Sequence, residues 1–243
     1  MEIGGDFFTS QGPPKAEQII EISGFQRVRQ RLEINIERKK GNIILIIGTR
    51  GIGKSTALEY FKEYSNNILK YDCSRFLDIG LHIPKLLDKD YNERGPYILK
   101  EIALVLSDNK EDDISKVIET LDKYEKGPFF LFIDNLDRLY QNKDDLGFVN
   151  YFFQTADPTL KALSKKVVIV ISCAPEWNIF LEQRDLSYMN FSNSITLEPL
   201  SSDEIKKLIE SRANSDGFKI EEIIETNLLP ILQVASRGNP RSV

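Results

Sequence analysis

One stretch of the sequence has residue types and spacing that suit the binding of phosphates. Residues 48–55 read Gly-Thr-Arg-Gly-Ile-Gly-Lys-Ser, which fits the P-loop pattern G-x-x-x-x-G-K-[ST]. Glycines let such a loop curl tightly, so that its N–H groups and the next helix face an anion. Lys54 would neutralise the β- and γ-phosphates, and the Ser55 hydroxyl would bind Mg²⁺. The residues expected to contact the nucleotide are Gly48, Thr49, Arg50, Gly51, Ile52, Gly53, Lys54, Ser55 and Thr56.

A carboxylate that could serve the same metal follows the apolar run Phe129–Ile133. An unbroken apolar run of this length indicates a strand buried on both faces, and Asp134 stands at its carboxyl end. Open parallel sheets bind ligands at that edge. Asp134 is therefore expected beside Ser55, where its carboxylate would hold the water shell of Mg²⁺.

Hydrophobic patterning indicates the elements that must position these groups. Asn42–Ile47 is an apolar run ahead of the loop, and Thr56–Tyr64 after the loop has apolar residues at helical spacing. Val167–Cys173 is a third run typical of a fully buried strand. In a parallel sheet its polar residue, Ser172, would lie at the level of the γ-phosphate. Shorter strands are expected at Asn67–Cys73 and Ser194–Leu197.

Helices are expected between these strands, and the alternation predicts an α/β fold with a parallel sheet covered on both faces. Ser201 or Ser202 would cap a later helix that has Asp203 and Glu204 in its first turn. We expect an N-terminal arm at residues 1–15, an α/β core at 16–200 and a small helical lid at 201–243. The core helices are expected within Ala16–Arg38, Tyr97–Leu106, Ile114–Tyr124 and Phe148–Leu163.

Composition excludes several other classes of protein. The 243 residues are 41% hydrophobic and 28% charged with a net charge of −5, as in a globular chain. No apolar run approaches the roughly 20 residues that cross a bilayer, so we expect no membrane segment. Two cysteines and one histidine exclude a disulfide scaffold and a Cys/His zinc site. The first residues do not read as a secretory signal, and the expected location is the cytoplasm.

Taken in order, the motifs resemble those of AAA+ and STAND-type P-loop ATPases, and most nearly the archaeal origin-recognition initiator ATPases and the archaeal ATPase group. The resemblance runs from about Ile22 to Val243. It implies an ASCE/AAA+ type core that binds ATP or ADP with Mg²⁺ and hydrolyses ATP. It also implies that Ser172 (or Cys173), at sensor 1, and Arg241, at sensor 2, respond to the γ-phosphate. The matching segments are GTRGIGKST (Walker A), FFLFIDNLDRL (Walker B), VVIVISCAP (sensor 1), ITLEPLSSDEIKKLIESR (lid entry) and GNPR (sensor 2).

Two departures from the family pattern bear on function. The family places Glu directly after the Walker B Asp, to activate the attacking water, and here that position is Asn135. Because an amide cannot accept a proton as a base, hydrolysis is expected to be slow or to rely on Asp137. Initiators also carry a winged-helix DNA-binding domain after the lid, and this chain stops at the sensor 2 helix. We expect the chain to be cut from a longer protein.

Three functions remain open on the sequence. The first is a slow ATPase switch in DNA replication initiation, able to self-assemble and to engage duplex DNA through the missing C-terminal domain. The second is a STAND-like signalling or regulatory module that contacts protein. The third is a transposition or plasmid-maintenance ATPase. Asp134, Asn135 and Asp137 are the candidate catalytic residues beside Lys54.

Overall fold

The computed structural model describes residues 19–124, 127–140, 158–176, 194–215, 217, 219, 225 and 228–240. The expected arm at residues 1–15 and the beginning of the helix expected at Phe148–Leu163 lie outside them. Within the described residues, a five-stranded parallel sheet has the order β2-β3-β4-β1-β5. The strands are β1 (Asn42–Ile47), β2 (Phe76–Asp78), β3 (Phe129–Asp134), β4 (Val167–Cys173) and β5 (Ser194–Thr196).

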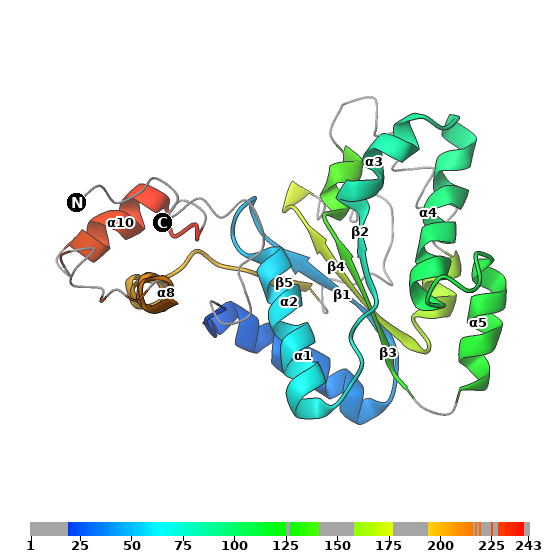
Figure 1. Cartoon of the computed structure of the whole chain (residues 1–243), viewed down its shortest axis with the longest axis horizontal. Coiled ribbons are helices and arrows are strands. Elements are labelled where there is room, and N and C mark those ends of the chain that lie inside the picture. The colour runs from blue at the N-terminus through cyan, green and yellow to red at the C-terminus, as the bar shows by residue number, and fades with distance from the viewer. Residues whose placement is uncertain are drawn as a thin grey trace.

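Two helical layers cover the faces of this sheet (Figure 1). Helices α1 (Ser23–Arg38) and α2 (Lys54–Tyr64) share one apolar cluster with alternate strand residues such as Ile44 and Phe132. On the other face, the intervening strand residues pack with α3 (Ile79–Leu87), α4 (Tyr91–Leu106) and α5 (Ile114–Lys123). Strands flanked in this way are buried on both faces, which explains their unbroken apolar runs. The predicted α/β fold with a parallel sheet is confirmed.

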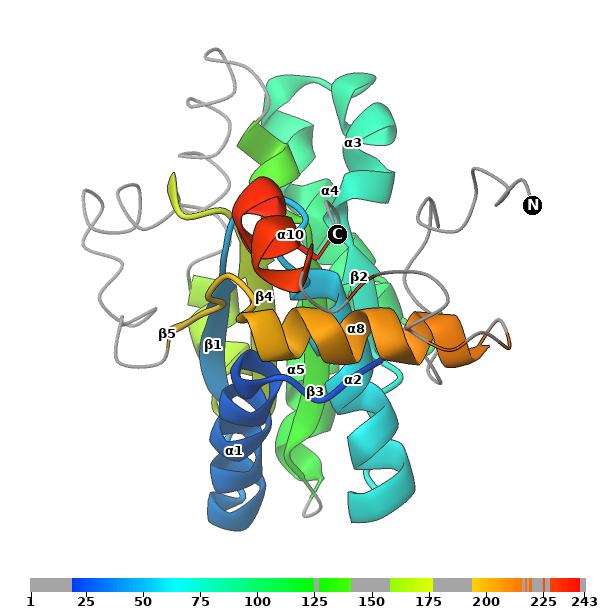
Figure 2. The same cartoon turned by 90° about the vertical axis from the view of Figure 1, so that its left-hand side faces the viewer.

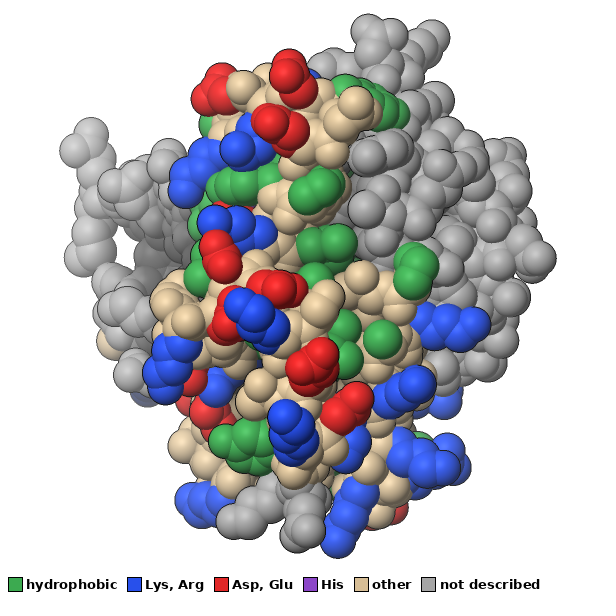
Figure 3. Space-filling view, turned by 90° about the vertical axis from the view of Figure 1, so that its right-hand side faces the viewer, with side chains coloured by type: hydrophobic (Ala, Val, Ile, Leu, Met, Phe, Trp, Pro, Cys, Tyr) green, Lys and Arg blue, Asp and Glu red, His purple; other side chains and the backbone are tan. Residues whose placement is uncertain are grey.

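The outer face that carries α4 and α5 shows acidic and basic side chains interspersed over its described part (Figure 3). Lys100 of α4 lies 2.7 Å from Asp112, and Lys116 of α5 lies 3.5 Å from Glu111. Exposed pairs of this kind contribute little to stability. They give this face a mixed rather than a single-sign charge.

The second strand was predicted at the wrong place. Instead of a strand at Asn67–Cys73, helix α2 runs on into a π-helical turn, η2 (Ser65–Leu69). The Tyr71 N–H then bonds to the Ser65 carbonyl at 3.0 Å, and the Cys73 N–H bonds to the Asn66 side chain at 3.0 Å. These N–H groups are engaged by the end of the helix, so they are not offered to a neighbouring strand. The actual strand β2 begins later, at Phe76.

The expected helical lid is represented by α8 (Ser202–Ser215) and α10 (Leu229–Ser236), which lie side by side next to the sheet (Figures 1 and 2). Ile205 and Leu229 join the same apolar cluster as α1 and α2. Glu204 accepts hydrogen bonds of 3.0 Å from both the backbone N–H and the hydroxyl of Ser23, which ties the start of α8 to the start of α1. The boundary between core and lid at residues 200 and 201 stays a prediction.

Candidate nucleotide-binding site

The P-loop connects β1 to α2 and has the backbone that phosphate binding requires. Gly51 and Gly53 have φ angles of 86° and 103°, a region that residues with a Cβ rarely adopt. The Gly48 N–H bonds to the Cys173 carbonyl at 3.2 Å, which fastens the start of the loop to the end of β4. Ile52 is buried in the core and anchors the loop from within. Helix α2 begins at Lys54, so its first N–H groups face the loop.

The Lys54 side chain turns back into the loop. Its ammonium donates to the carbonyl of Gly48 at 2.7 Å and to that of Thr49 at 3.2 Å. Only 8% of the residue is exposed. A positive charge held here adds to the favourable potential of the helix N-terminus, so the loop is suited to bind an anion.

Asp134 is the centre of a hydrogen-bonded chain that joins the start of α2 to the ends of β3 and β4. It is 3% exposed, and its Oδ2 accepts a 2.7 Å hydrogen bond from the Ser55 hydroxyl. Its Oδ1 accepts a hydrogen bond from the hydroxyl of Ser172. The backbone N–H of Asn135 donates in turn to the Ser172 oxygen at 3.0 Å. The elements that follow β1 and β3 are thereby fixed to each other and to β4.

These oxygen atoms fit a magnesium ion. Mg²⁺ prefers oxygen ligands, keeps several waters, and in nucleotide sites is held by one or two protein groups together with phosphate. The Ser55 hydroxyl and the Asp134 carboxylate already lie in contact. Within the described residues, no group of three or more His, Cys, Asp or Glu side chains could form an all-protein metal cage.

Asn135 lies between two carboxylates. Its side-chain nitrogen donates to Asp134 Oδ2 at 3.1 Å and to Asp78 Oδ1 at 3.2 Å. The backbone of Asn135 has a φ of 56°, which Asn and Asp adopt more readily than other residues that carry a side chain. The amide therefore links the ends of β2 and β3.

Asp78 belongs to this cluster and was missed in the sequence. It pairs in register with Asp134, on the neighbouring strand. Because the second strand was predicted at Asn67–Cys73, Asp78 was not recognised as the end of a strand. A signal was available: Phe76-Leu77-Asp78 has the same pattern as Phe132-Ile133-Asp134, two apolar residues followed by a carboxylate.

Asp137 lies on the short 3-10 helix η3 (Leu136–Tyr140) after β3. Its Oδ1 is buried and has no hydrogen-bond partner among the residues described. Burial raises the pKa of the Asp137 carboxyl above its ordinary value, although the charge of Lys54 opposes this rise. A desolvated carboxylate near the P-loop lysine suits a group that accepts a hydrogen bond or a proton from water.

The lid reaches the P-loop through a residue that the sequence did not single out. The side-chain nitrogen of Asn239 donates to the Arg50 carbonyl at 2.9 Å. Gly238, with a φ of 66°, packs against Pro199 and accepts a 2.8 Å hydrogen bond from the Leu200 N–H through its carbonyl. Arg241, the expected sensor 2 residue, lies outside the described residues.

The structure thus brings most of the expected site residues to one edge of the sheet. Ser55, Asp134, Asn135 and Ser172 are joined by the hydrogen bonds above. Lys54 directly precedes Ser55 and bonds to the loop carbonyls, and Asp137 lies close enough to Lys54 for their charges to interact. Ser172 has no exposed surface, and its hydroxyl is engaged with Asp134. Its role toward the γ-phosphate stays a prediction.

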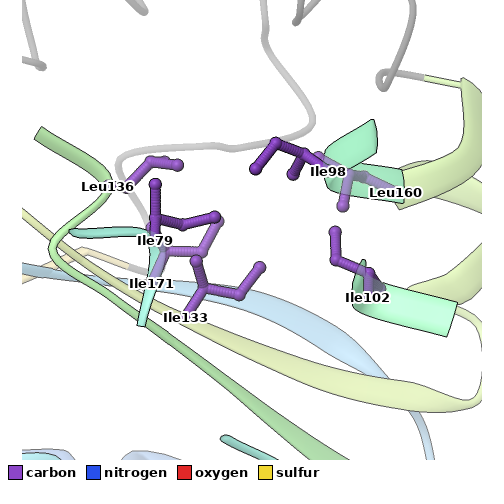
Figure 4. Close-up of a pocket in the computed structure, with 7 residues that line it drawn as sticks. All are labelled: Ile79, Ile98, Ile102, Ile133, Leu136, Leu160 and Ile171. Atoms are coloured by element: carbon purple, nitrogen blue, oxygen red, sulfur yellow. The ribbon is translucent and has the colours of Figure 1, made fainter. Parts of the chain in front are cut away.

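A small apolar cavity is lined only by aliphatic side chains (Figure 4). It offers no polar group to a nucleotide. Two of its lining residues, Ile79 and Leu136, directly follow Asp78 and Asn135, so the cavity walls anchor the backbone of both polar residues. The other lining residues are Ile98, Ile102, Ile133, Leu160 and Ile171.

The family model described as "ATPase family associated with various cellular activities (AAA)" matches residues 44–182, more than half of the chain. This range includes the P-loop, Asp134 and Ser172. None of the curated proteins matches the chain in sequence.

Solved structures share the fold over nearly the whole chain. Drosophila ORC bound to DNA gives a TM-score of 0.56 at 16% identity, covering 98% of this chain and 56% of that one. Cdc6p from Pyrobaculum aerophilum gives 0.57 at 18%, covering 97% and 62%. Domain III of the replication initiation protein DnaA from Thermotoga maritima gives 0.55 at 15%, covering 99% and 85%. The chain thus spans less than two thirds of the ORC and Cdc6p chains. Together with the family match, these structures confirm the resemblance inferred from the motifs.

Proposed function

This chain belongs to the AAA family of ATPases, and we propose that it binds ATP with Mg²⁺, hydrolyses it slowly and acts as a nucleotide-controlled switch in DNA replication initiation. One observation carries the proposal: Ser55, Asp134 and Ser172 form a hydrogen-bonded chain beside the lysine of a glycine-rich loop. A phosphate cradle and a metal-binding pair are thereby built next to each other.

Each side chain has a role in binding the substrate. The loop N–H groups and Lys54 hold the phosphates of ATP and neutralise their charge. Ser55 and Asp134 would hold Mg²⁺, which supplies further neutralisation of the phosphate oxygens. Asp137 has a buried oxygen without a hydrogen-bond partner among the described residues and lies close enough to Lys54 and Asp134 for their charges to interact, so it would orient the water.

Slow hydrolysis follows from Asn135. The residue directly after the magnesium-binding aspartate is well placed to contact the attacking water, but an amide oxygen can only accept a hydrogen bond from it. General-base catalysis contributes about 10²–10⁴-fold to a rate. A site without a base at this position would keep its nucleotide for longer, which suits a switch.

The lid would report the state of the nucleotide. Asn239 already touches the P-loop at Arg50, and Arg241 is two residues further along. We propose that Arg241 reaches the γ-phosphate, so that loss of this phosphate loosens the lid. Motion of α8 would then be transmitted to α1 through the Glu204–Ser23 hydrogen bonds.

The replication context is supported by two structural neighbours, Drosophila ORC bound to DNA and the replication initiation protein DnaA. Duplex DNA, engaged through a further C-terminal domain, and other copies of this chain are the proposed partners.

No helix in the part of the chain that the structure describes is long and apolar enough to cross a membrane. Cys73 and Cys173 are both free and buried, as is usual in the cytoplasm, where we place the protein.

The test is nucleotide retention and turnover on the purified chain. The protein is denatured, any released nucleotide is identified, and ATP hydrolysis is then followed with and without duplex DNA. We expect bound ADP and turnover well below the typical value of about 10 per second. The Lys54→Ala variant is the control and should release no nucleotide. A wild-type chain without affinity for ATP would overturn the proposal.

A further inference from the structure

One carboxylate at the candidate site has no role in the proposed function. Asp78 ends β2, next to the strand that carries Asp134, and the two residues pair in register. The carboxyl ends of neighbouring parallel strands meet at the edge where such sheets bind ligands. Asp78 therefore stands at the edge of the sheet that holds Ser55 and Asp134, although it is distant from both in sequence.

The contacts of Asp78 connect it to the metal-binding pair. Asp134 Oδ2 is the oxygen that accepts from Ser55, and the Asn135 amide nitrogen donates to this same atom at 3.1 Å. The same nitrogen also donates to Asp78, at 3.2 Å to Oδ1 and 3.4 Å to Oδ2. One amide group thus separates the Asp78 carboxylate from the oxygen that faces the expected magnesium position.

Asp78 is held firmly in this place. Its Oδ1 accepts a 2.8 Å hydrogen bond from the Gly80 N–H and so caps helix α3. The next side chain, Ile79, is fully buried against Leu136, which follows Asn135 (Figure 4). The Asp78 carboxylate is thus held by the backbone of β2, by the N-terminus of α3 and by the Asn135 amide. It therefore has little freedom to move away from the site.

We propose that Asp78 is a catalytic residue that supplies the carboxylate missing after Asp134 and accepts the proton of the attacking water; the assignment rests on the proposed ATPase function. The water oxygen bonds to the γ-phosphorus of ATP, and the bond from that phosphorus to the β–γ bridging oxygen breaks. One proton of the water passes to an Asp78 oxygen, which releases it to solvent after the reaction, and the other proton stays on the phosphate. The products are ADP, which keeps the bridging oxygen, and inorganic phosphate. Asn135 spaces Asp78 from Asp134 and donates hydrogen bonds to both.

Asp78→Asn tests the charge and basicity of this side chain alone. Asn caps helices as well as Asp does and has nearly the same size, so α3 should stay in place. The turnover number for ATP should fall by about 100-fold. The dissociation constant for ATP, measured by fluorescence of an ATP analogue, should change less than about threefold, because Asp78 is not part of the phosphate cradle.

Asp113→Asn is the matched control. Asp113 caps α5 through a 2.9 Å hydrogen bond from the Ser115 N–H, in the same way as Asp78 caps α3. Helix α5 lies on the outer side of α4, away from α2 and the P-loop (Figure 1). Turnover and ATP affinity should both stay at the wild-type level. A loss of turnover that appears with both substitutions would show a general effect of a changed helix cap and would overturn the assignment.

The double variant Asp78→Asn/Asn135→Asp separates a chemical role from a structural one. It exchanges the carboxylate and the amide across the same hydrogen bond, and Asp tolerates the φ of 56° at position 135. Turnover should recover at least about tenfold over Asp78→Asn. A double variant that stays as slow as Asp78→Asn would overturn the proposal. A carboxylate would then be present again at position 78 or 135, but ATP turnover would not have recovered.

The remaining outcomes distinguish this proposal from the ATPase function on which it rests. Turnover by Asp78→Asn at the wild-type rate, with loss of turnover in Asp137→Asn, would assign the proton to Asp137 and overturn the proposal. A wild-type chain that binds ATP but never hydrolyses it would also overturn the proposal and leave nucleotide binding intact. A wild-type chain that does not bind ATP would remove the proposed function itself.

Discussion

The segments that follow β1 and β3 lie at the same edge of the sheet, but they are built differently. The P-loop after β1 is built from backbone: left-handed Gly51 and Gly53, N–H groups at the start of α2, and carbonyls that hold Lys54. The segment after β3 is built from side chains that different strands contribute. A site made of backbone follows a local sequence pattern, whereas a site made of side chains from several strands depends on how those strands pair.

The difference also suggests a division of labour. The P-loop contains the groups proposed to bind phosphate, and its sequence fits the P-loop pattern at every defined position. The region after β3 contains the groups proposed to act on water, and it departs from the family pattern at Asn135. Variants on the P-loop side should therefore change ATP affinity, and variants on the β3 side should change turnover or stability.

The largest effect is expected for Lys54→Ala. Its ammonium is buried in the loop, where it would meet the phosphates in a setting of low dielectric constant. Charge-assisted hydrogen bonds contribute about 1.5–3 kcal/mol each, so affinity for ATP should fall by about 100-fold. Isothermal titration calorimetry measures this change, and Lys62→Ala, on the same helix, is the control. Retained affinity in Lys54→Ala would contradict the role given to the P-loop.

A smaller effect, on stability, is expected for Ser172→Ala. The hydroxyl of this buried residue donates to Asp134 and accepts from the Asn135 N–H. Its removal leaves buried polar groups unpaired, which costs about 1–3 kcal/mol. The midpoint of thermal unfolding should fall by about 2–12 °C for a chain of this size. Ser164→Ala removes an exposed hydroxyl and should change little. If Ser172 only contacts the γ-phosphate, stability without nucleotide will not change.

Asn135→Glu should raise the rate of ATP hydrolysis by about tenfold while ATP affinity stays constant, because it places a second base beside the attacking water. The backbone conformation at this position costs a bulky residue about 1 kcal/mol. Asn135→Gln is the matched control, since it has the same length and the same backbone cost but no base. A rapid wild-type rate that Asn135→Glu does not increase would show that the absence of Glu is not what limits turnover.

The smallest effect is expected for Asp137→Asn. Burial raises the pKa of Asp137 in the folded protein, so the folded state holds this proton more tightly than the unfolded state does. Stability is then lost as the pH rises from the ordinary Asp pKa through the raised one, and at pH 7 the charged form opposes folding. The neutral amide should raise the thermal midpoint at pH 7 by about 2 °C.

The difference should vanish at about pH 3, below the ordinary pKa of Asp, where the wild-type carboxyl is also protonated. Thermal unfolding at the two pH values, with Asp137→Ala as the control for the lost side chain, gives the comparison. A variant that is less stable than the wild type at pH 7 would show that the charge of Asp137 helps the fold, through Lys54 or Arg138.

The fold was largely accessible from the sequence because its strands are short apolar runs. β1, β3 and β4 coincide with the predicted apolar runs. A strand that helices cover on both faces needs apolar residues at every position, so its apolar run is unbroken and easy to recognise. β2 was misplaced for the opposite reason. It is only three residues long, and the residues before it resemble a strand in composition but complete the end of α2.

By itself, the sequence determined the P-loop, the neighbouring residues Ser55 and Asp134, and the family, because each depends on a local pattern or on the order of the motifs along the chain. The tertiary structure decided what surrounds Asn135. Asp78 lies beside it because β2 pairs with β3 in parallel register, and Asn239 meets Arg50 because the lid folds back on the P-loop. Such contacts arise from strand pairing and packing between distant segments, which no local pattern encodes.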